Sequence, residues 1–440
     1  MAIVLGDATL NAVGDDPLRS ASLPAALCVS VWLWGSPVWA DPPRTDVEAT
    51  GRADPRLVSF DRLMGEFLRE HELPGAALAV AHKGKLVYAR GFGHADRDAG
   101  ELVGPRALFR IASISKPLTA VAVLQLMERG RLKLDDSVFQ VLQLQQPKDR
   151  GIRFDPRWKN VTIEHLLQHR GGWDRDKSFD PMFRSPTIVK ELDVPPPARP
   201  WDIIHYMLRQ PLDFDPGEKD VYSNFGYCLL GRVIEKVSGQ TYEEYVRKEV
   251  LAPLNIHTMR LGATLPEKRA RGEVQYYVAK KARGTAVMGP HLGEPVPEPY
   301  GAWCLESMDA HGGWLSSAPD LVRFATAFDD PRRCKVLKSK SIEILFARPP
   351  GAAGRDRNGK PRDAYYACGW MVRPVDEKGH ANTWHAGSLP GTSTLLVRRH
   401  DGLTWAVLFN SRTSAKKVEP ASAIDPLVHK AADAVKNWPR

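Results

Sequence analysis

Cysteine is scarce in this chain, with five residues among 440. Cys28 lies in an apolar N-terminal run, and the other four are far apart, at Cys228, Cys304, Cys334 and Cys368. Their spacing lacks the paired rhythm of a structural zinc site. Four cysteines allow three disulfide pairings, and the sequence does not choose between these and free thiols. We therefore expect no metal site and no cofactor.

Other absences narrow the class further. Beyond residue 40 no apolar run is long enough to span a membrane. The net charge is +9, but the basic residues are scattered and form no stripe with aromatic residues, so we expect no nucleic-acid partner. With 43% hydrophobic and 26% charged residues, the composition is that of a globular protein with a large core. A small-molecule or peptide substrate is the expected partner.

The N-terminus has the features of an export signal. Residues 21–34 form an apolar run of signal-peptide length, and Val38 and Ala40 fit the −3 and −1 positions of a cleavage site. The mature chain would then begin at Asp41, although Arg19 is the only basic residue before the run. We expect residues 1–40 to be a signal peptide of a periplasmic or secreted bacterial protein. An uncleaved anchor is the alternative.

The most informative motif is Ser113-Ile114-Ser115-Lys116. An apolar periodicity follows it and ends at Gly130, which predicts a helix from Ser113 to that glycine. The serine would lie at the positive end of the helix dipole, and Lys116, three residues on, would lie on the same face. An amine beside a serine hydroxyl produces a nucleophile without histidine. The motif therefore favours a serine acyl-transfer enzyme.

Ser-x-x-Lys alone is weak support, because Ser414 and Lys417 repeat the spacing with no helical stripe behind them. Two further motifs strengthen it. Tyr222-Ser223-Asn224, the only Tyr-x-Asn in the chain, follows a Pro-Gly loop and precedes a predicted helix. His385-x-Gly387 precedes the predicted strand hairpin 392–409, which turns at Asp401-Gly402.

In this order the three motifs resemble those of the serine β-lactamase/D,D-peptidase superfamily, and most closely its class C-like branch. Residues 109–116, 161–172 and 312–320 support the resemblance, which spans about residues 57–435. It implies an α/β (α+β) fold of the β-lactamase/transpeptidase type, an antiparallel sheet flanked by helices. We expect a flexible lead-in at 41–56 and a catalytic domain at 57–437. Within it, 57–130 and 301–437 would form the mixed α/β part, and 131–300 a mostly helical insertion. The apolar patterns themselves predict a β-hairpin at residues 75–89 and a last helix near residues 424–435.

The resemblance also implies roles for individual residues. Ser113 would be the nucleophile, Lys116 the amine that helps to deprotonate it, and Tyr222 a phenolate-like base and proton shuttle stabilised by Lys116. The remaining residues would bind the substrate or its oxyanion: Asn224 holds the amide, Gly387 allows close approach, Ser388 completes the oxyanion hole together with the Ser113 N–H, and His385 and Asn410 contact a carboxylate.

His385 stands where family β-lactamases usually have lysine. A histidine is only partly charged near neutral pH, so it suits a carboxylate less well and could act as a neutral donor. This points away from an efficient β-lactamase. The expected reaction is hydrolysis of D-amino-acid peptides, in the manner of a D,D-carboxypeptidase, through a Ser113 acyl-enzyme. A carboxylesterase and a weak class C-type β-lactamase are the enzymatic alternatives.

Two other classes compete with this interpretation. A penicillin- or peptidoglycan-binding module on the same scaffold would be favoured if Ser113 or Tyr222 were missing, and both are present. A metallohydrolase is suggested by His165 and His169, four residues apart. However, Glu164 precedes both histidines instead of lying between them, as zincin motifs require.

Overall fold

The computed structural model describes residues 47–149, 151–279, 281–356 and 358–439, so the predicted signal peptide lies outside the described residues. At the centre is strand β2 (Gly75–His82), whose residues from Gly75 to Ala81 are all buried. A strand covered on both faces needs no alternation of polar and apolar residues, which explains this uninterrupted run of small apolar residues. Its hairpin with β3 (Lys85–Asp96), predicted from the sequence, is confirmed.

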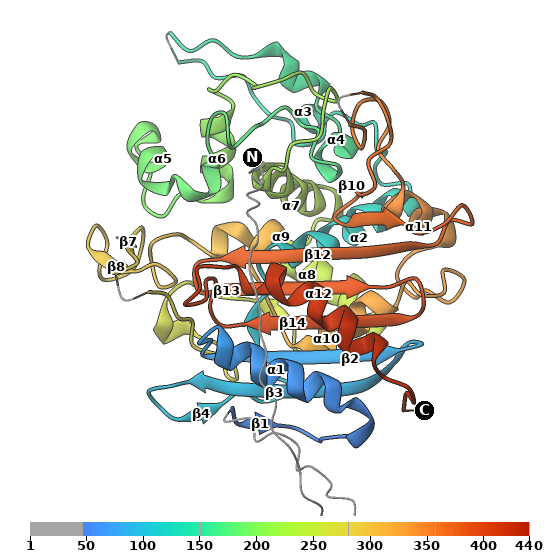
Figure 1. The fold of residues 1–440 in the computed structure, drawn as a ribbon. Coiled ribbons are helices and arrows are strands. Elements are labelled where there is room, and N and C mark those ends of the chain that lie inside the picture. The colour runs from blue at the N-terminus through green and yellow to red at the C-terminus, as the bar shows by residue number, and fades with distance from the viewer. Residues whose placement is uncertain (1–46, 150, 280, 357, 440) are drawn as a thin grey trace, which may run out of the picture. The chain divides into compact units, whose positions relative to one another are not determined.

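Nine strands of the described chain form one antiparallel sheet (Figure 1). The predicted C-terminal hairpin is confirmed, because β13 (Thr392–Arg398) and β14 (Leu403–Phe409) pair across Asp401-Gly402, with Leu395 opposite Val407. β14 then pairs with β2, which joins the two ends of the chain in one sheet. The strand order is β1 (Ala49–Thr50), β3, β2, β14 (Leu403–Phe409), β13 (Thr392–Arg398), β12 (Ala381–Leu389), β11 (Met371–Pro374), β10 (Tyr365–Tyr366), with β4 (Glu101–Leu102) paired to β3.

Helices cover both faces of the sheet. Ala76, Leu78 and Val80 belong to the core under α1 (Val58–Glu70) and α12 (Pro420–Asp433). Ala77 and Ala79 belong to the opposite core, with α2 (Ser115–Glu128) and α10 (Ala318–Thr326). Figure 1 shows α1 and α12 crossing one face of the strands. The expected fold class, an antiparallel sheet flanked by helices, is confirmed.

Most of the segment between residues 131 and 300 is helical and loop structure. Its longest helix, α7 (Asn224–Ser238), packs against α2, and this contact connects the segment to the sheet core. Short strands also occur in it: β6 (Arg260–Leu261) joins a small sheet with β5 (Phe109–Arg110) and β9 (Trp314–Ser316), and β7 (Arg283–Thr285) pairs with β8 (Pro295–Pro297). The helices are α3 (Val138–Val141), α4 (Ile163–Leu167), α5 (Ser185–Leu192), α6 (Pro200–Met207), α7 (Asn224–Ser238) and α8 (Tyr242–Tyr245), followed by α9 (Asp309–Gly312) and α11 (Ser339–Phe346).

Two boundary predictions need correction. The lead-in predicted to be flexible to residue 56 is ordered from residue 49, because β1 pairs with β3 and a 3₁₀ turn follows at Pro55–Leu57. The last helix, α12, begins at Pro420, four residues before its predicted start at Ile424. In the described chain all four cysteines are free thiols, and no helix is long and apolar enough to cross a membrane.

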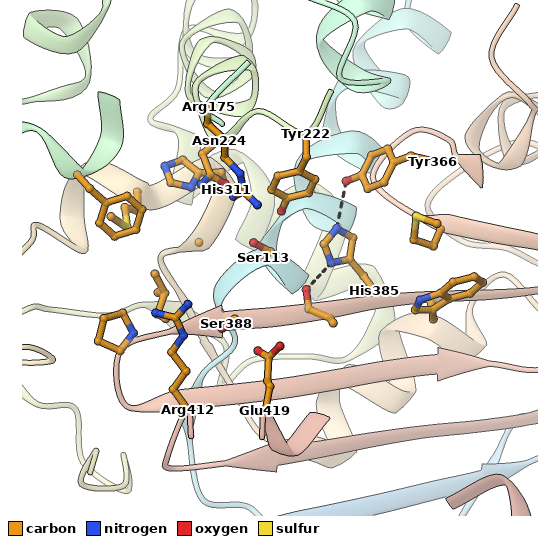
Figure 2. Close-up of a pocket in the computed structure, with 18 residues that line it drawn as sticks. Ser113, Arg175, Tyr222, Asn224, His311, Tyr366, His385, Ser388, Arg412 and Glu419 are labelled. Atoms are coloured by element: carbon orange, nitrogen blue, oxygen red, sulfur yellow. Dashed lines mark hydrogen bonds between the residues drawn. The ribbon is translucent and has the colours of Figure 1, made fainter. Parts of the chain in front are cut away.

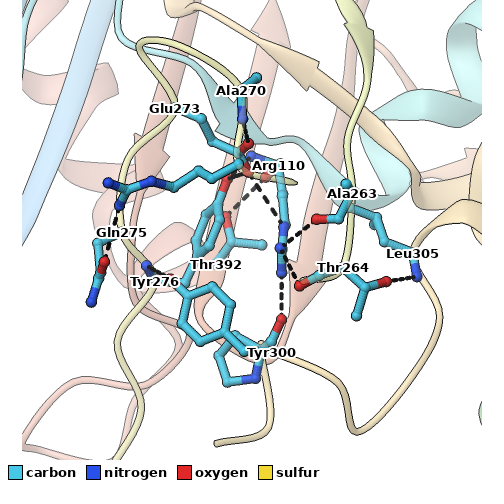
Figure 3. A network of polar contacts seen from close by, with 12 residues as sticks. Arg110, Ala263, Thr264, Ala270, Glu273, Gln275, Tyr276, Tyr300, Leu305 and Thr392 are labelled. Carbon is cyan, nitrogen blue, oxygen red and sulfur yellow. Dashed lines mark hydrogen bonds and ion pairs between the residues drawn. The ribbon is translucent and has the colours of Figure 1, made fainter. Parts of the chain in front are cut away.

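A buried arginine ties the insertion loops to the strand that leads into Ser113 (Figure 3). The Arg110 guanidinium is 1% exposed and donates to the carbonyls of Pro299 at 2.7 Å and Ala263 at 2.8 Å. It also lies 3.5 Å from the Glu273 carboxylate and over the ring of Tyr276, 4.4 Å from its centre. This network fixes the chain three residues before Ser113.

Replacing Arg110 with methionine should destabilise the protein by about 3–5 kcal/mol, because it leaves a buried carboxylate and several buried carbonyls without a partner. Chemical denaturation measures the free energy of unfolding. Arg332→Met is the control, since the Arg332 side chain is 88% exposed. A loss below about 1 kcal/mol in Arg110→Met, the range of exposed ion pairs, would contradict the structural role of the network.

Candidate active site

Ser113 lies in a tight turn between β5 and α2. The turn is a short 3₁₀ helix, Ala112–Ile114, and the α-helix begins at Ser115, so the predicted helix start at Ser113 is two residues too early. Ala112 has a φ of 48°, a left-handed conformation that non-glycine residues rarely adopt and that is often found at functional sites. The Ser115 hydroxyl stabilises the turn by donating to the Ala112 carbonyl at 2.7 Å.

The Lys116 amine reaches Ser113 from a fully buried position. Its Nζ lies 3.1 Å from Ser113 Oγ and also donates to Asn224 Oδ1 at 2.8 Å and to the His311 carbonyl at 3.0 Å. Burial holds the pKa of Lys116 well below its usual value, with Arg175 lowering it further and Asp180 opposing the change. A lysine with a depressed pKa has a larger neutral fraction near neutral pH, and only the neutral amine accepts a proton.

Asp180, which no sequence motif marks, holds Asn224 in place. The Asn224 Nδ2 donates to Asp180 Oδ2 at 2.6 Å, which leaves the Asn224 Oδ1 facing Lys116. Ser223, not Asn224, caps helix α7, by accepting from Gly226 N at 3.2 Å. The Asn224 side chain is therefore free to take part in the polar cluster.

Tyr222 also lies at this cluster, but as a neutral phenol. Burial raises its pKa above the ordinary value, and the Ser113 hydroxyl and Arg175 only partly offset this. Lys116 Nζ lies 4.6 Å from the ring centre and the Arg175 guanidinium 5.1 Å from it. Burial therefore favours the neutral phenol over the predicted phenolate, and the role of Tyr222 as base and proton shuttle stays a prediction.

His385 lies within β12, and both of its ring nitrogens are already engaged (Figure 2). Nδ1 is 2.6 Å from the Ala386 carbonyl, which can only accept, so Nδ1 carries the proton. Burial lowers the pKa of His385 to about 3, so the ring is neutral and Nε2 accepts from the Tyr366 hydroxyl at 3.1 Å. His385 therefore offers a substrate neither positive charge nor a free N–H, contrary to both expected roles.

Two residues later, the strand makes its closest approach to the Ser113 turn. A Cβ on Gly387 would lie 2.2 Å from the Ile111 carbonyl oxygen and 2.3 Å from Thr394 Oγ1. Only glycine fits there. The predicted close approach of the Gly387 backbone to the substrate stays a prediction. Thr394 Oγ1 also donates to that carbonyl at 3.0 Å, and Ser388 follows at the edge of the cavity.

A cavity of about 680 Å³ opens over Ser113. It brings together most of the residues singled out in the sequence, and three charged ones that were not: Arg175, Arg412 and Glu419. The predicted residues that line it are Ser113, Tyr222, Asn224, His385 and Ser388. No sequence motif marks the three charged residues. Arg175 lies between α4 and α5, and Arg412 and Glu419 lie in the loop between β14 and α12.

Asn410 does not reach the cavity, so the expected carboxylate contact is wrong. Its side chain is fully buried, and Nδ2 donates to the His94 carbonyl at 3.0 Å. The two histidines of the metal hypothesis also have other partners. His165 Nδ1 accepts from Thr162 N, and His169 Nδ1 accepts from Ser223 N. Within the described ranges no group of three or more His, Cys, Asp or Glu side chains is placed to hold a metal ion.

The fold and the cluster of Ser113, Lys116 and Tyr222 define a serine hydrolase. The chain belongs to the β-lactamase family, whose profile, described as Beta-lactamase, matches residues 60–429. The resemblance inferred from the motifs is thereby confirmed.

Relatives and solved structures agree with this assignment. Penicillin-binding protein 4* of Bacillus subtilis is 28% identical, covering 80% of this chain and 71% of that protein. Esterase EstB of Burkholderia gladioli is 29% identical, covering 75% and 83%. An octameric penicillin-binding protein homologue from Pyrococcus abyssi superposes with a TM-score of 0.64 and 27% identity, covering 87% of this chain and 77% of that one.

Substituting Gly387 with alanine should displace the Ser113 turn, because the new methyl group overlaps a backbone carbonyl. We expect a loss of about 1–3 kcal/mol in unfolding free energy from overpacking. Hydrolysis of p-nitrophenyl acetate should fall about 100-fold, since a shift of about 1 Å at a catalytic group has this effect. Gly104→Ala is the matched control, because a Cβ there meets nothing within 4 Å. Equal activities in the two variants would contradict the close-approach requirement.

Proposed function

We propose that this chain is an exported serine hydrolase that forms an acyl-enzyme at Ser113 and cleaves D-amino-acid peptides in the manner of a D,D-carboxypeptidase. The observation that carries the proposal is the 3.1 Å contact between Ser113 Oγ and the buried amine of Lys116. Export rests on the signal-like residues 1–40.

In the acylation step, Ser113 Oγ attacks the substrate carbonyl while its proton passes to the neutral Lys116 amine. The backbone N–H groups of Ser113 and Ser388 stabilise the negative charge that develops on the carbonyl oxygen. Asn224 has a second Nδ2 hydrogen besides the one given to Asp180, and it donates this hydrogen to the substrate amide.

Collapse of the tetrahedral intermediate breaks the bond to the leaving group, which must gain a proton. The Tyr222 hydroxyl donates it and is reprotonated from the Lys116 ammonium, a role that suits a phenol with a raised pKa. Water then attacks the Ser113 ester, and the same groups carry its proton to Ser113 Oγ. The site returns to its starting protonation state with one peptide bond hydrolysed.

The neutral state of His385 bears on the choice of substrate. A cavity without a fixed cation at this position is poorly matched to a ligand carboxylate, which counts against efficient β-lactamase activity. A carboxylesterase is the second candidate. Its support is the neutral His385 together with the similarity to an esterase, EstB.

The test is the intact mass of the protein after incubation with a penicillin. Wild-type protein should form a covalent adduct and Ser113→Ala should form none. Ser414→Ala, in the other Ser-x-x-Lys sequence, should keep the adduct. The same spectrum identifies the N-terminus, which should be Asp41 after export.

Each alternative result has a distinct meaning. Consumption of the penicillin without an adduct would indicate β-lactamase turnover. Untouched penicillin, with Ser113-dependent hydrolysis of p-nitrophenyl acetate, would favour the esterase. An adduct on Ser113→Ala would contradict the assignment of the nucleophile.

A further inference from the structure

We propose that Arg412 and Glu419 form a subsite for a free α-amino-acid headgroup, an ammonium and a carboxylate carried on one carbon atom. The carboxylate would bind Arg412 and the ammonium would bind Glu419. As a substrate subsite it rests on the proposed function, and it specifies the chemical class of that substrate.

Both side chains extend from the loop that joins β14 to α12 into the cavity over Ser113 (Figure 2). Within the part of the chain that the structure describes, neither forms an ion pair or a side-chain hydrogen bond. Arg412 is exposed and Glu419 is half-buried, so both charged groups can be reached from the cavity. Two unpaired charges of opposite sign in one cavity are therefore available to a ligand.

Glu419 has an obvious structural use that it does not fulfil. It occupies the N-cap position of α12, where an acidic side chain ordinarily accepts from a backbone N–H of the first turn. Its side chain makes no such hydrogen bond, and it lines the cavity instead. Helix capping therefore does not account for the position of this carboxylate.

A second cavity shares part of its lining with the first. It measures about 710 Å³ and shares Pro390, Arg412 and Glu419 with the cavity over Ser113. The two charged residues therefore line both cavities.

The other charged groups near Ser113 do not serve this purpose. His385 is neutral and its nitrogens are engaged, and the Arg175 guanidinium lies over the Tyr222 ring. Arg412 lines both cavities together with Glu419, whereas Arg175 lines only the first. Arg412 is therefore the arginine placed with Glu419 for a carboxylate, which a guanidinium can bind through two parallel hydrogen bonds. The carboxylate of Glu419 beside it repels a second anion and attracts an ammonium. The pair thus selects a zwitterionic group over an anion or a cation alone.

The test measures binding without turnover, by calorimetric titration of the mature protein with four ligands. They differ in whether the amino end, the carboxyl end, both or neither carries a charge. These are D-alanine, N-acetyl-D-alanine, D-alaninamide and N-acetyl-D-alaninamide. D-Alanine should bind about tenfold more tightly than either singly blocked ligand, since each blocked end loses one charge-assisted hydrogen-bonded contact. L-Alanine, titrated in parallel, shows whether the subsite distinguishes enantiomers.

Two variants separate the contributions. Glu419→Gln should weaken the binding of D-alanine and D-alaninamide about tenfold and leave that of N-acetyl-D-alanine unaffected. Arg412→Gln should weaken the binding of D-alanine and N-acetyl-D-alanine about tenfold and leave that of D-alaninamide unaffected. Arg333→Gln and Glu377→Gln, both exposed and outside the two cavities, are the matched controls. Equal affinity of all four ligands for wild-type protein, or unchanged D-alanine binding in both cavity variants, would overturn the proposal.

The outcome is independent of the chemistry at Ser113. If D-alanine binds with this charge pattern but penicillin forms no Ser113 adduct and esters are not cleaved, the acyl-enzyme proposal fails and the subsite stands. If Ser113 is acylated but the four ligands bind equally, the acyl-enzyme stands and the subsite fails.

Discussion

A buried lysine amine is the constraint on which the site depends. Lys116 has no exposed surface, and a primary amine in such a position must be satisfied by hydrogen-bond acceptors. Its three acceptors are Ser113 Oγ, Asn224 Oδ1 and the His311 carbonyl, which come from the turn before α2, from α7 and from α9. The amine therefore connects the sheet core to the helical segment. The burial that requires these partners also depresses the pKa of Lys116 and so favours the neutral amine on which the proposed mechanism depends.

The same burial determines the charge of the neighbouring groups. Tyr222 and His385 are both kept neutral, the first because its pKa is raised and the second because its pKa is lowered to about 3. In the proposed mechanism, proton transfer around Ser113 thus starts from neutral groups in a buried setting, where hydrogen bonds to a developing oxyanion are strong. The charged side chains that line the cavity are Arg175, Arg412 and Glu419. The two proposals therefore place chemistry and substrate selection in different parts of one cavity.

The sequence predicted what is local and periodic. Both long hairpins and the serine, tyrosine and histidine motifs were identified because each has a signal within a few residues. The residues that were missed act across long sequence separations: Asp180 contacts Asn224, and Tyr366 contacts a histidine in another strand. The prediction for Asn410 was wrong because a position at the end of a strand does not specify the direction in which the side chain points. The Asn410 amide donates to the carbonyl of His94 inside the fold.

The most direct test of this account is the pKa of Lys116, measured by nuclear magnetic resonance of protein labelled with ¹³C at the lysine ε-carbon. Comparison with Lys116→Arg assigns the signal. The account predicts a titration midpoint well below 10.5, the ordinary lysine value, because burial disfavours the ammonium form. A midpoint at or above 10.5 would mean that Lys116 is a cation at neutral pH. It could then orient Ser113 but not accept its proton, which contradicts the central claim.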